Sequence, residues 1–449
     1  MAYAENDAVA ARAAAVRVAE AMVARRNAFR VAMSGDLEVW LDCDLCPRQR
    51  LGTLSHDRGQ VRFHYDKLWL AQQDIAFAID PQLTLDAGPL FPKPAAGNFG
   101  IFLDSSPDRW GQTLMRRREA LQAKDESRVA RTLYSWDFLL GVQDATRQGA
   151  LRFRVKDSDE FLAHEALAAP PVTGLAELAS IAKELTRKDI NDLDKLRRWL
   201  AVLIAPGASL GGARPKANFC DKDGSFWIAK FPAHDDDRDI GSWEGVASWL
   251  ARRAGIDMPE AKVMHLSRSG YHTFCVRRFD RLNGRRRFYA SAMTLLGKDT
   301  SEGTSYLELA EFLAKRGDPN HLQADLEQLF HRVAFNVAIG NRDDHLRNHG
   351  FILGPRGWRL APAFDVNPDI GKAEHVLNLE DVDNRPSLET VLSTAAFYRL
   401  SPEHARKIVT KVANVVDDWE AAARRAGISR ADIGLGASAF GAQAVFRQS

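Results

Sequence analysis

One stretch of the chain, residues 339–366, constrains the fold more than any other. It reads IGNRDDHLRNHGFILGPRGWRLAPAFDV, and its polar side chains follow a definite order. Asp343 is followed five residues later by Asn348, and a short predicted hairpin then leads to Asp365. An aspartate, an asparagine and a second aspartate in this order are the groups with which kinases orient an attacking hydroxyl and hold Mg²⁺. The stretch therefore predicts a fold in which a loop and a hairpin border one phosphoryl-transfer cleft.

Two features upstream favour the same interpretation. Gly211 and Gly212 follow an apolar stretch, so their backbone N–H groups can approach phosphate oxygens closely, although adjacent glycines are also common in ordinary turns. Lys230 ends the second strand of a predicted hairpin among apolar neighbours, where an ammonium needs an anionic partner. We expect that partner to be Glu244, on a helix that begins at a Ser242 cap. A solvated strand end for the lysine and an exposed position for the glutamate are the alternatives.

Patterning divides the chain into four predicted parts. Residues 1–30, rich in alanine, predict a helical extension, and residues 31–155, with short alternating segments and turn signals, predict a β-rich subdomain. Residues 156–285 hold the remainder of a small lobe, with the glycine loop, the strand lysine and the hinge. Residues 286–449 predict a helical lobe with the catalytic loop, because apolar residues recur there at three- and four-residue spacing. The predicted class is α+β: a bilobal, protein-kinase-like fold with a β-rich N-terminal subdomain and a mainly helical C-terminal lobe.

Composition argues against several other classes of protein. Hydrophobic residues make up 45% of the 449 residues and charged residues 27%, as in ordinary globular proteins, and the net charge of +2 gives no reason to expect direct binding to nucleic acid. Four cysteines in a chain of this length do not form a disulfide framework. Neither a signal peptide nor an apolar run of membrane-spanning length is visible, so we expect a cytoplasmic protein without membrane association.

Two residue pairs leave a zinc site open as an alternative. Cys43 and Cys46 have the Cys-x2-Cys spacing of a ligand pair, but no second pair or histidine lies nearby, which favours two cysteines in a loop. His345 and His349 are four residues apart and would share a helix face, with a neighbouring aspartate as third ligand. Glycines on both sides of this loop disfavour a helix there. Aspartates in such a loop are also common capping or turn residues.

Eight segments carry a wider resemblance. They are Leu51-Gly-Thr-Leu, Phe63-His-Tyr-Asp, Ser105-Ser-Pro-Asp-Arg-Trp-Gly, Gly149-Ala-Leu-Arg-Phe, Ser209-Leu-Gly-Gly-Ala-Arg-Pro-Lys, Val276-Arg-Arg-Phe-Asp-Arg, Asn341-Arg-Asp-Asp-His-Leu-Arg-Asn-His-Gly-Phe and Leu360-Ala-Pro-Ala-Phe-Asp-Val. Over nearly the whole chain after about residue 35, these motifs resemble the HipA-type serine/threonine kinases, the toxin components of bacterial toxin–antitoxin pairs. The last two motifs are the most specific. The N-terminal extension has no counterpart in the resemblance.

The resemblance implies an ATP- and Mg²⁺-dependent protein kinase that inhibits growth, with an aminoacyl-tRNA synthetase as its target. It also implies a HipB-like helix-turn-helix antitoxin as partner, and contact with DNA only through that antitoxin. By motif position Asp343 is the catalytic residue, Asn348 and Asp365 are the Mg²⁺ ligands, and Ser209 is the site of autophosphorylation. The residues implied to bind ATP are Gly211, Gly212, Ala213, Lys230, Arg277, Phe279, Asp280 and His345. Arg277 stands where some members carry an acidic residue.

Two other functions stay open at the level of sequence. A small-molecule phosphotransferase of the aminoglycoside type shares the Asp-x4-Asn spacing but lacks the β-rich N-terminal module. A catalytically weak, kinase-like scaffold that binds a transcriptional repressor is the second alternative. The presence of Lys230, Asp343, Asn348 and Asp365 together argues against the scaffold.

Overall fold

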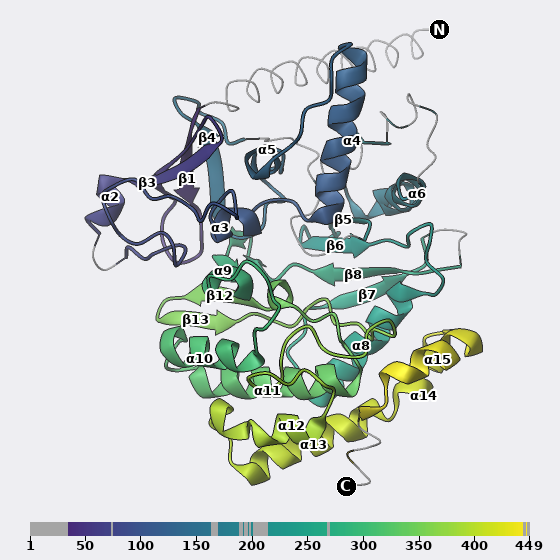
Figure 1. Cartoon of the computed structure of the whole chain (residues 1–449). Coiled ribbons are helices and arrows are strands. Elements are labelled where there is room, and N and C mark those ends of the chain that lie inside the picture. The colour runs from purple at the N-terminus through teal and green to yellow at the C-terminus, as the bar shows by residue number, and fades with distance from the viewer. Residues whose placement is uncertain are drawn as a thin grey trace.

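The structure is a computed structural model of the chain. The residues that it describes are 35–72, 75–162, 169–187, 192, 196, 199–200, 214–266, 270–442 and 446. The predicted N-terminal extension, the predicted phosphorylation site Ser209 and the loop residues Gly211, Gly212 and Ala213 lie outside these residues. Figure 1 shows a β-rich region and long helix α4 at the top, a second sheet in the middle and a helical lobe below.

The N-terminal region is built on an antiparallel sheet with the strand order β3-β2-β1-β4. Its strands are β1 (Asp36–Leu41), β2 (Gln49–Asp57), β3 (Gln60–Tyr65) and β4 (Leu151–Val155). The predicted hairpin between β2 and β3 is present, and Arg58 and Gly59 take the positive φ angles that a tight two-residue turn requires. Helices α2 (Lys67–Leu70), α3 (Gly100–Asp104), α4 (Arg109–Asp125) and α5 (Ser135–Leu140) connect β3 to β4.

The second sheet has the antiparallel order β5-β6-β8-β7. Its strands are β5 (Lys216–Cys220), β6 (Phe226–Lys230), β7 (Ala261–Met264) and β8 (Thr273–Arg277). Alternate side chains divide its two faces, because successive residues of a strand point to opposite sides. On one face Phe219 and Trp227 share a buried cluster with Trp110 and Leu114 of α4 and with helix α6 (Leu175–Leu185). The other face is left for the cleft.

Helix α8 (Ile240–Ala254) packs against β7 and β8. The Ser242 cap predicted from the sequence is wrong, because the helix begins at Ile240, three residues before the start that a Ser242 cap implies. Asp239 caps it instead, and its carboxylate accepts a hydrogen bond from the backbone N–H of Ser242 at 3.1 Å. An aspartate caps a helix as well as a serine does and adds a favourable charge at the N-terminus, which explains its use here.

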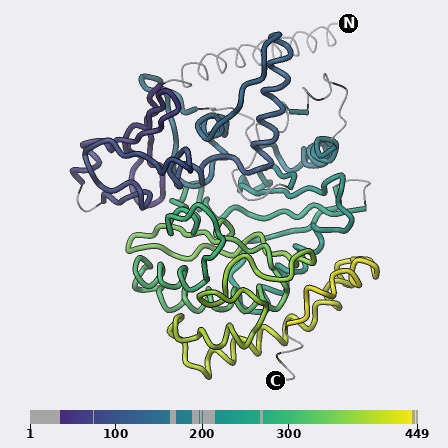
Figure 2. The backbone as a smooth tube through the Cα atoms, in the orientation of Figure 1, coloured from purple at the N-terminus to yellow at the C-terminus, as the bar shows by residue number. Residues whose placement is uncertain are grey.

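The C-terminal lobe combines a small sheet, in the order β11-β12-β13, with a bundle of helices. Its strands are β11 (Tyr289–Ser291), β12 (Gly350–Gly354) and β13 (Gly357–Leu360), and just before them β9 (Arg281–Leu282) and β10 (Arg285–Arg286) pair as a separate two-stranded sheet. The helices are α9 (Ala292–Leu295), α10 (Tyr306–Arg316), α11 (Leu322–Ala338), α12 (Leu388–Ser393), α13 (Pro402–Val416), α14 (Trp419–Arg425) and α15 (Arg430–Gly436), and single 3₁₀ turns also occur. Figure 2 follows the chain from the teal second sheet into this green and yellow lobe.

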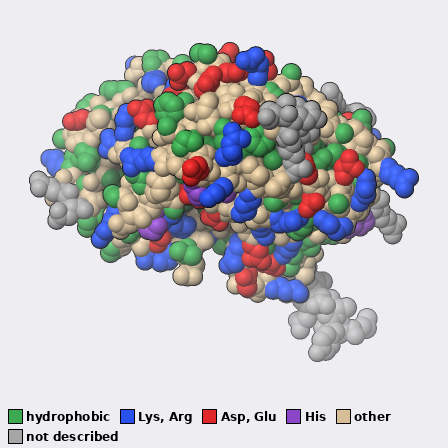
Figure 3. Space-filling view, turned by 90° about the horizontal axis from the view of Figure 1, so that it is seen from below, with side chains coloured by type: hydrophobic (Ala, Val, Ile, Leu, Met, Phe, Trp, Pro, Cys, Tyr) green, Lys and Arg blue, Asp and Glu red, His purple; other side chains and the backbone are tan. Residues whose placement is uncertain are grey.

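The arrangement confirms the predicted α+β class and the bilobal, kinase-like architecture. The domain boundaries drawn from the sequence stay predictions. Seen from below, the surface carries Lys and Arg side chains interspersed with Asp and Glu, in keeping with the small net charge (Figure 3). None of the helices in the described part of the chain is long and apolar enough to cross a membrane.

Candidate functional site

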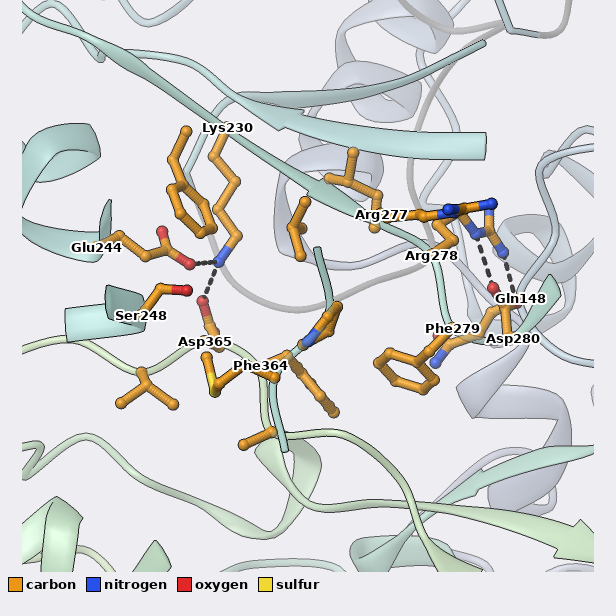
Figure 4. Close-up of a pocket in the computed structure, with 17 residues that line it drawn as sticks. Gln148, Lys230, Glu244, Ser248, Arg277, Arg278, Phe279, Asp280, Phe364 and Asp365 are labelled. Carbon is orange, nitrogen blue, oxygen red and sulfur yellow. Dashed lines mark hydrogen bonds and ion pairs between the residues drawn. The ribbon is translucent and has the colours of Figure 1, made fainter. Parts of the chain in front are cut away.

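An open cavity lies between the second sheet, helix α8 and the segment that follows β13, and its empty space, including the open mouth, is about 720 Å³ (Figure 4). Ile228 and Val276 line it from the sheet, and Phe364 lines it from the opposite side. Charged side chains gather at the end where Lys230 lies, while the hinge residues 277–280 line the other end. Such a cavity suits a ligand with a flat apolar ring and an anionic tail.

Lys230 occupies the charged end of the cavity. Its ammonium contacts the Glu244 carboxylate, as the sequence predicted, and also lies 2.6 Å from Asp365 Oδ1 (Figure 4). Burial alone would lower the pKa of Lys230, but the charges of Asp365 and Glu244 raise it above its ordinary value. The lysine is therefore a fixed positive charge, shared between the sheet, helix α8 and the helical lobe.

Asp365 takes a backbone conformation that is rare for a residue with a side chain. Its φ is +58°, in the left-handed region, where strain is tolerated mainly at functional sites. Burial raises the pKa of its carboxyl group, but the charges of Lys230 and Lys216 outweigh burial and leave a pKa of about 2. Asp365 is thus ionised at every physiological pH.

A second lysine, Lys216, belongs to this end of the cleft, and the sequence analysis did not assign it. Lys216 on β5 lies directly opposite Lys230 on β6, so the two side chains share the cleft face of the sheet. Both are largely buried, with side chains 2% and 14% exposed. The signal was present in the sequence, because a hairpin that turns at residues 221–224 pairs position 216 with position 230. Like charges placed opposite each other on a sheet are unfavourable unless anions lie between or beside them.

The catalytic-loop segment begins where helix α11 ends. Gly340, with φ of +65°, closes the helix, and a side chain there would meet the backbone oxygen of Ala439 at 2.4 Å. Asp343 follows on the surface, with its side chain 63% exposed and its carboxylate in contact with the Lys372 ammonium. The segment after Asp365 therefore reaches back to the predicted catalytic residue.

Asn348 and His345 each carry a buried polar atom without a hydrogen-bond partner, Asn348 Oδ1 and His345 Nδ1. The Asn348 amide donates to the Asp343 backbone oxygen at 3.5 Å, which leaves its carbonyl oxygen available. His345 lies within electrostatic reach of the Asp365 carboxylate. A free carbonyl oxygen and a permanently ionised carboxylate are ligands that Mg²⁺ accepts, so Asn348 and Asp365 fit the metal implied by the sequence.

Asp344, the neighbour of the predicted catalytic residue Asp343, has a structural role. Its buried carboxylate accepts hydrogen bonds from Tyr306 Oη at 2.6 Å and from Asn336 Nδ2 at 2.8 Å, and His349 Nε2 lies 2.7 Å away. Burial raises the pKa of Asp344, but His349 and Tyr306 lower it below the ordinary value. This cluster fixes the loop to helices α10 and α11.

Neither zinc alternative is supported. His349 is bound to Asp344, and the Sγ atoms of Cys43 and Cys46 lie 3.7 Å apart as buried free thiols. Among the residues that the structure describes, no three His, Cys, Asp or Glu side chains are grouped to hold a metal ion.

The hinge end of the cavity is lined by aromatic rings and by a cluster of ion pairs in which the Asp280 carboxylate has all of its hydrogen bonds satisfied. Phe279 lies 5.5 Å from Phe364, ring centre to ring centre, so aromatic rings from both lobes meet there. Arg277 is half exposed and pairs with Glu260 at 3.3 Å. The buried Asp280 lines the cavity, but its carboxylate is occupied by guanidinium groups and a backbone N–H. A role for Asp280 in contacting a base stays a prediction.

Sequence comparisons identify two domains in this chain. Residues 37–134 match the HipA N-terminal domain and residues 208–419 match the HipA-like C-terminal domain. A putative kinase of Haemophilus influenzae is 27% identical over 181 residues, which are 35% of this chain and 52% of that protein. The serine/threonine-protein kinase toxin HipA of Shewanella oneidensis is 26% identical over 191 residues, 36% of this chain and 43% of that protein. The chain thus spans about half the length of the curated relatives it matches.

A solved structure shares the fold over most of the chain. It is the complex of Shewanella oneidensis MR-1 toxin–antitoxin system HipA, HipB and its operator DNA. The TM-score is 0.63 at 18% sequence identity, and the match covers 91% of this chain and 95% of that one.

Proposed function

Because this chain belongs to the HipA family, whose N-terminal and C-terminal domains it carries in order, we propose that it is an ATP- and Mg²⁺-dependent serine/threonine protein kinase that acts as a growth-inhibiting toxin. The convergence of Lys230, Glu244 and Asp365 at one end of a largely apolar cavity supports this function best. A strand lysine paired with a helix glutamate is the arrangement with which kinases position nucleotide phosphates.

The shape and lining of the cavity support one orientation of a nucleotide. The base would lie against the rings of Phe279 and Phe364 at the hinge end, and the phosphates would extend toward Lys230, opposite which Lys216 lies on the neighbouring strand. The two ammonium groups offset the charge of the phosphates in a site from which water is largely excluded. Asn348 and Asp365 would hold Mg²⁺, which supplies further neutralisation of phosphate charge when it is bound.

Asp343 supplies the remaining chemistry. It orients the hydroxyl of a target serine in line with the γ-phosphate and accepts its proton as the serine oxygen–phosphorus bond forms. The bond between the γ-phosphorus and the β,γ-bridging oxygen breaks in the same step, and ADP leaves. Asp343 contacts Lys372 and Asp365 contacts Lys230, so both carboxylates exchange these partners as the nucleotide and the target bind. The exposed position of Asp343 suits a protein target that approaches from outside.

The proposed partner and target rest on the family resemblance. The target we propose is an aminoacyl-tRNA synthetase, and the partner a HipB-like antitoxin through which the protein would meet DNA. A relative with HipB and operator DNA in its structure supports this partner. Autophosphorylation at Ser209 completes the proposal, since a phosphate of about −1.5 to −2 charge at the head of the loop would repel ATP.

Transfer of radiolabelled phosphate from ATP tests the proposal. The wild-type protein labels itself and a synthetase substrate, and Asp343→Asn lowers labelling about 10²- to 10⁴-fold. Since the Asp343 side chain is mostly exposed, the variant keeps the wild-type thermal stability. Equal labelling by both proteins would contradict the assignment of Asp343. Ser209→Ala keeps target labelling while self-labelling falls, and undiminished self-labelling would identify another acceptor.

A further inference from the structure

A row of buried charges crosses the phosphate end of the cleft and alternates in sign along its length. Glu244 contacts Lys230, Lys230 lies 2.6 Å from Asp365, and the charge of Lys216 also acts on Asp365. The row ends at Asp108, whose Oδ2 lies 2.9 Å from Lys216 Nζ, with both side chains at most 4% exposed. Asp108 is the member of this row that the N-terminal region contributes.

The fold places Asp108 at this point through helix α4. Asp108 caps the helix by accepting a hydrogen bond from the backbone N–H of Gly111 at 2.8 Å. Trp110 and Leu114, on the first turns of α4, pack into the cluster on the second sheet. In Figure 1 the lower end of α4 accordingly stands over β5. The cap therefore cannot move relative to Lys216 without disturbing a packed core.

The pair has a specific consequence for Lys216. A buried ammonium without a partner is costly, and Lys216 has two anions within its electrostatic reach, Asp108 and Asp365. Without Asp108, the attraction of Asp365 would draw Lys216 toward a carboxylate that is needed for the metal. With Asp108 in place, the Lys216 ammonium is held by an ion pair of 2.9 Å, and its residue stays opposite Lys230 on the cleft face of the sheet.

We propose that Asp108 is a positioning residue of the nucleotide site: from the N-terminal β-rich subdomain, it holds the Lys216 ammonium beside the space that receives the phosphates. The inference rests on the nucleotide-binding function proposed above. Through Asp108, the N-terminal subdomain would be a structural component of the phosphate site and not an accessory module.

Calorimetric titration with two ligands tests the inference in the presence of Mg²⁺. One ligand is the non-hydrolysable β,γ-imido analogue of ATP, and the other is adenosine, which has the base and ribose but no phosphate. Asp108→Asn weakens binding of the analogue about tenfold and leaves adenosine binding unchanged. The asparagine side chain still caps α4, because Asn and Asp are equivalent at that position, so the change removes the charge selectively.

Glu119→Gln is the matched control. Glu119 is also a buried carboxylate of α4, paired with Arg128 at 2.5 Å, and stands about 16 Å further along the helix at 1.5 Å per residue. It loses an ion pair and some stability, yet both ligands bind as they do to the wild type. Equal weakening of both ligands in Asp108→Asn, or no weakening of the analogue, would overturn the positioning role.

Asp108→Glu covers the case in which the asparagine variant does not fold. It keeps the charge but displaces Lys216 by the length of a methylene, so analogue binding weakens about threefold and adenosine binding does not change. Unchanged binding of the analogue would overturn the inference. A wild-type protein that binds neither ligand would instead refute the proposed function itself, so the two failures are distinguishable.

Discussion

Two buried ionic clusters lie at opposite ends of the same cavity, and they differ in how completely their polar atoms are satisfied. At the hinge, the Asp280 carboxylate accepts from Arg278 at 2.9 and 2.6 Å, from Arg281 at 2.8 Å and from the Gly149 backbone N–H at 2.8 Å. At the phosphate end, Asp365 is strained, and a buried oxygen of Asn348 has no hydrogen-bond partner. A cluster whose polar atoms all have hydrogen-bond partners stabilises the fold. A cluster with an unpaired polar atom and a strained backbone is typical of a site that binds a ligand.

The hinge cluster also joins the N-terminal region to the hinge. Arg278 donates to the backbone oxygen of Thr146 at 2.6 Å, and Gly149 donates to Asp280, so the segment before β4 is tied to the hinge. Burial raises the pKa of Asp280, but Arg278 and Arg281 lower it well below its usual range. Removing one partner from such a cluster leaves uncompensated buried charge.

Asp280→Asn should therefore have the largest effect on stability. We expect the free energy of unfolding to fall by about 3–5 kcal/mol, because the buried guanidinium groups of Arg278 and Arg281 lose their counter-ion. Urea unfolding followed by circular dichroism measures the change. A loss below 1 kcal/mol would show that the hinge cluster is not what joins the subdomains.

At the phosphate end of the cavity, Asp365→Asn should reduce phosphate transfer far more than it reduces stability. Lys230 keeps Glu244 as a partner, and asparagine tolerates the left-handed backbone conformation at least as well as aspartate does. Phosphate transfer should fall about 10²-fold or more, since a metal ligand is lost, while the free energy of unfolding at neutral pH falls by only about 2 kcal/mol, the contribution of the ionised carboxylate. Radiolabel transfer and urea unfolding on the same preparation give both values. A stability loss as large as that of Asp280→Asn would erase the contrast between the two clusters.

Tyr306→Phe probes the support of the catalytic loop. The change removes one of the hydrogen bonds to the buried Asp344 carboxylate, and the remaining contacts from Asn336 and His349 persist. We expect a loss of about 1–2 kcal/mol in unfolding free energy. Thermal unfolding measures it, and an unchanged midpoint would mean that Asn336 and His349 suffice to hold the loop.

The protonation of Asp365 in acid should give the smallest change in the free energy of unfolding. The pKa of Asp365 is about 2 in the folded protein against an ordinary 3.8, so its contribution to stability is complete above 3.8 and is lost as the pH falls toward 2. Between pH 5 and pH 3 the wild type should lose about 1 kcal/mol more stability than Asp365→Asn. Parallel losses in the two proteins would show that the carboxylate is not held by the lysines.

Local patterns in the sequence predicted most of this architecture. The Lys230–Glu244 contact followed from a strand lysine among apolar residues and a following amphipathic helix, and both elements are set by short-range periodicity. The order of the two aspartates and Asn348 predicted a cleft because loop and hairpin are adjacent in the chain. The structure brings Lys230 to Asp365 directly, and Lys372 connects the segment after Asp365 with Asp343.

Local sequence patterns could not predict contacts between residues that are far apart in the sequence. Asp108 and Lys216 are buried together although 108 positions separate them, and no periodicity connects a helix cap with a distant strand. The sequence also did not reveal the structural role of Asp344. Two adjacent aspartates in a loop look the same in sequence whether their carboxylates face solvent or a buried tyrosine. The cap of α8 was misplaced by three residues because Asp239 and Ser242 are both good capping residues.

The central claim is that a single cleft receives a nucleotide triphosphate with its metal. A crystal structure with the β,γ-imido analogue of ATP and Mg²⁺ tests it most directly. We predict the base beside Phe279, the phosphates between Lys230 and Lys216, and the metal on Asn348 and Asp365. A nucleotide bound elsewhere, or phosphates pointing away from both lysines, would contradict it.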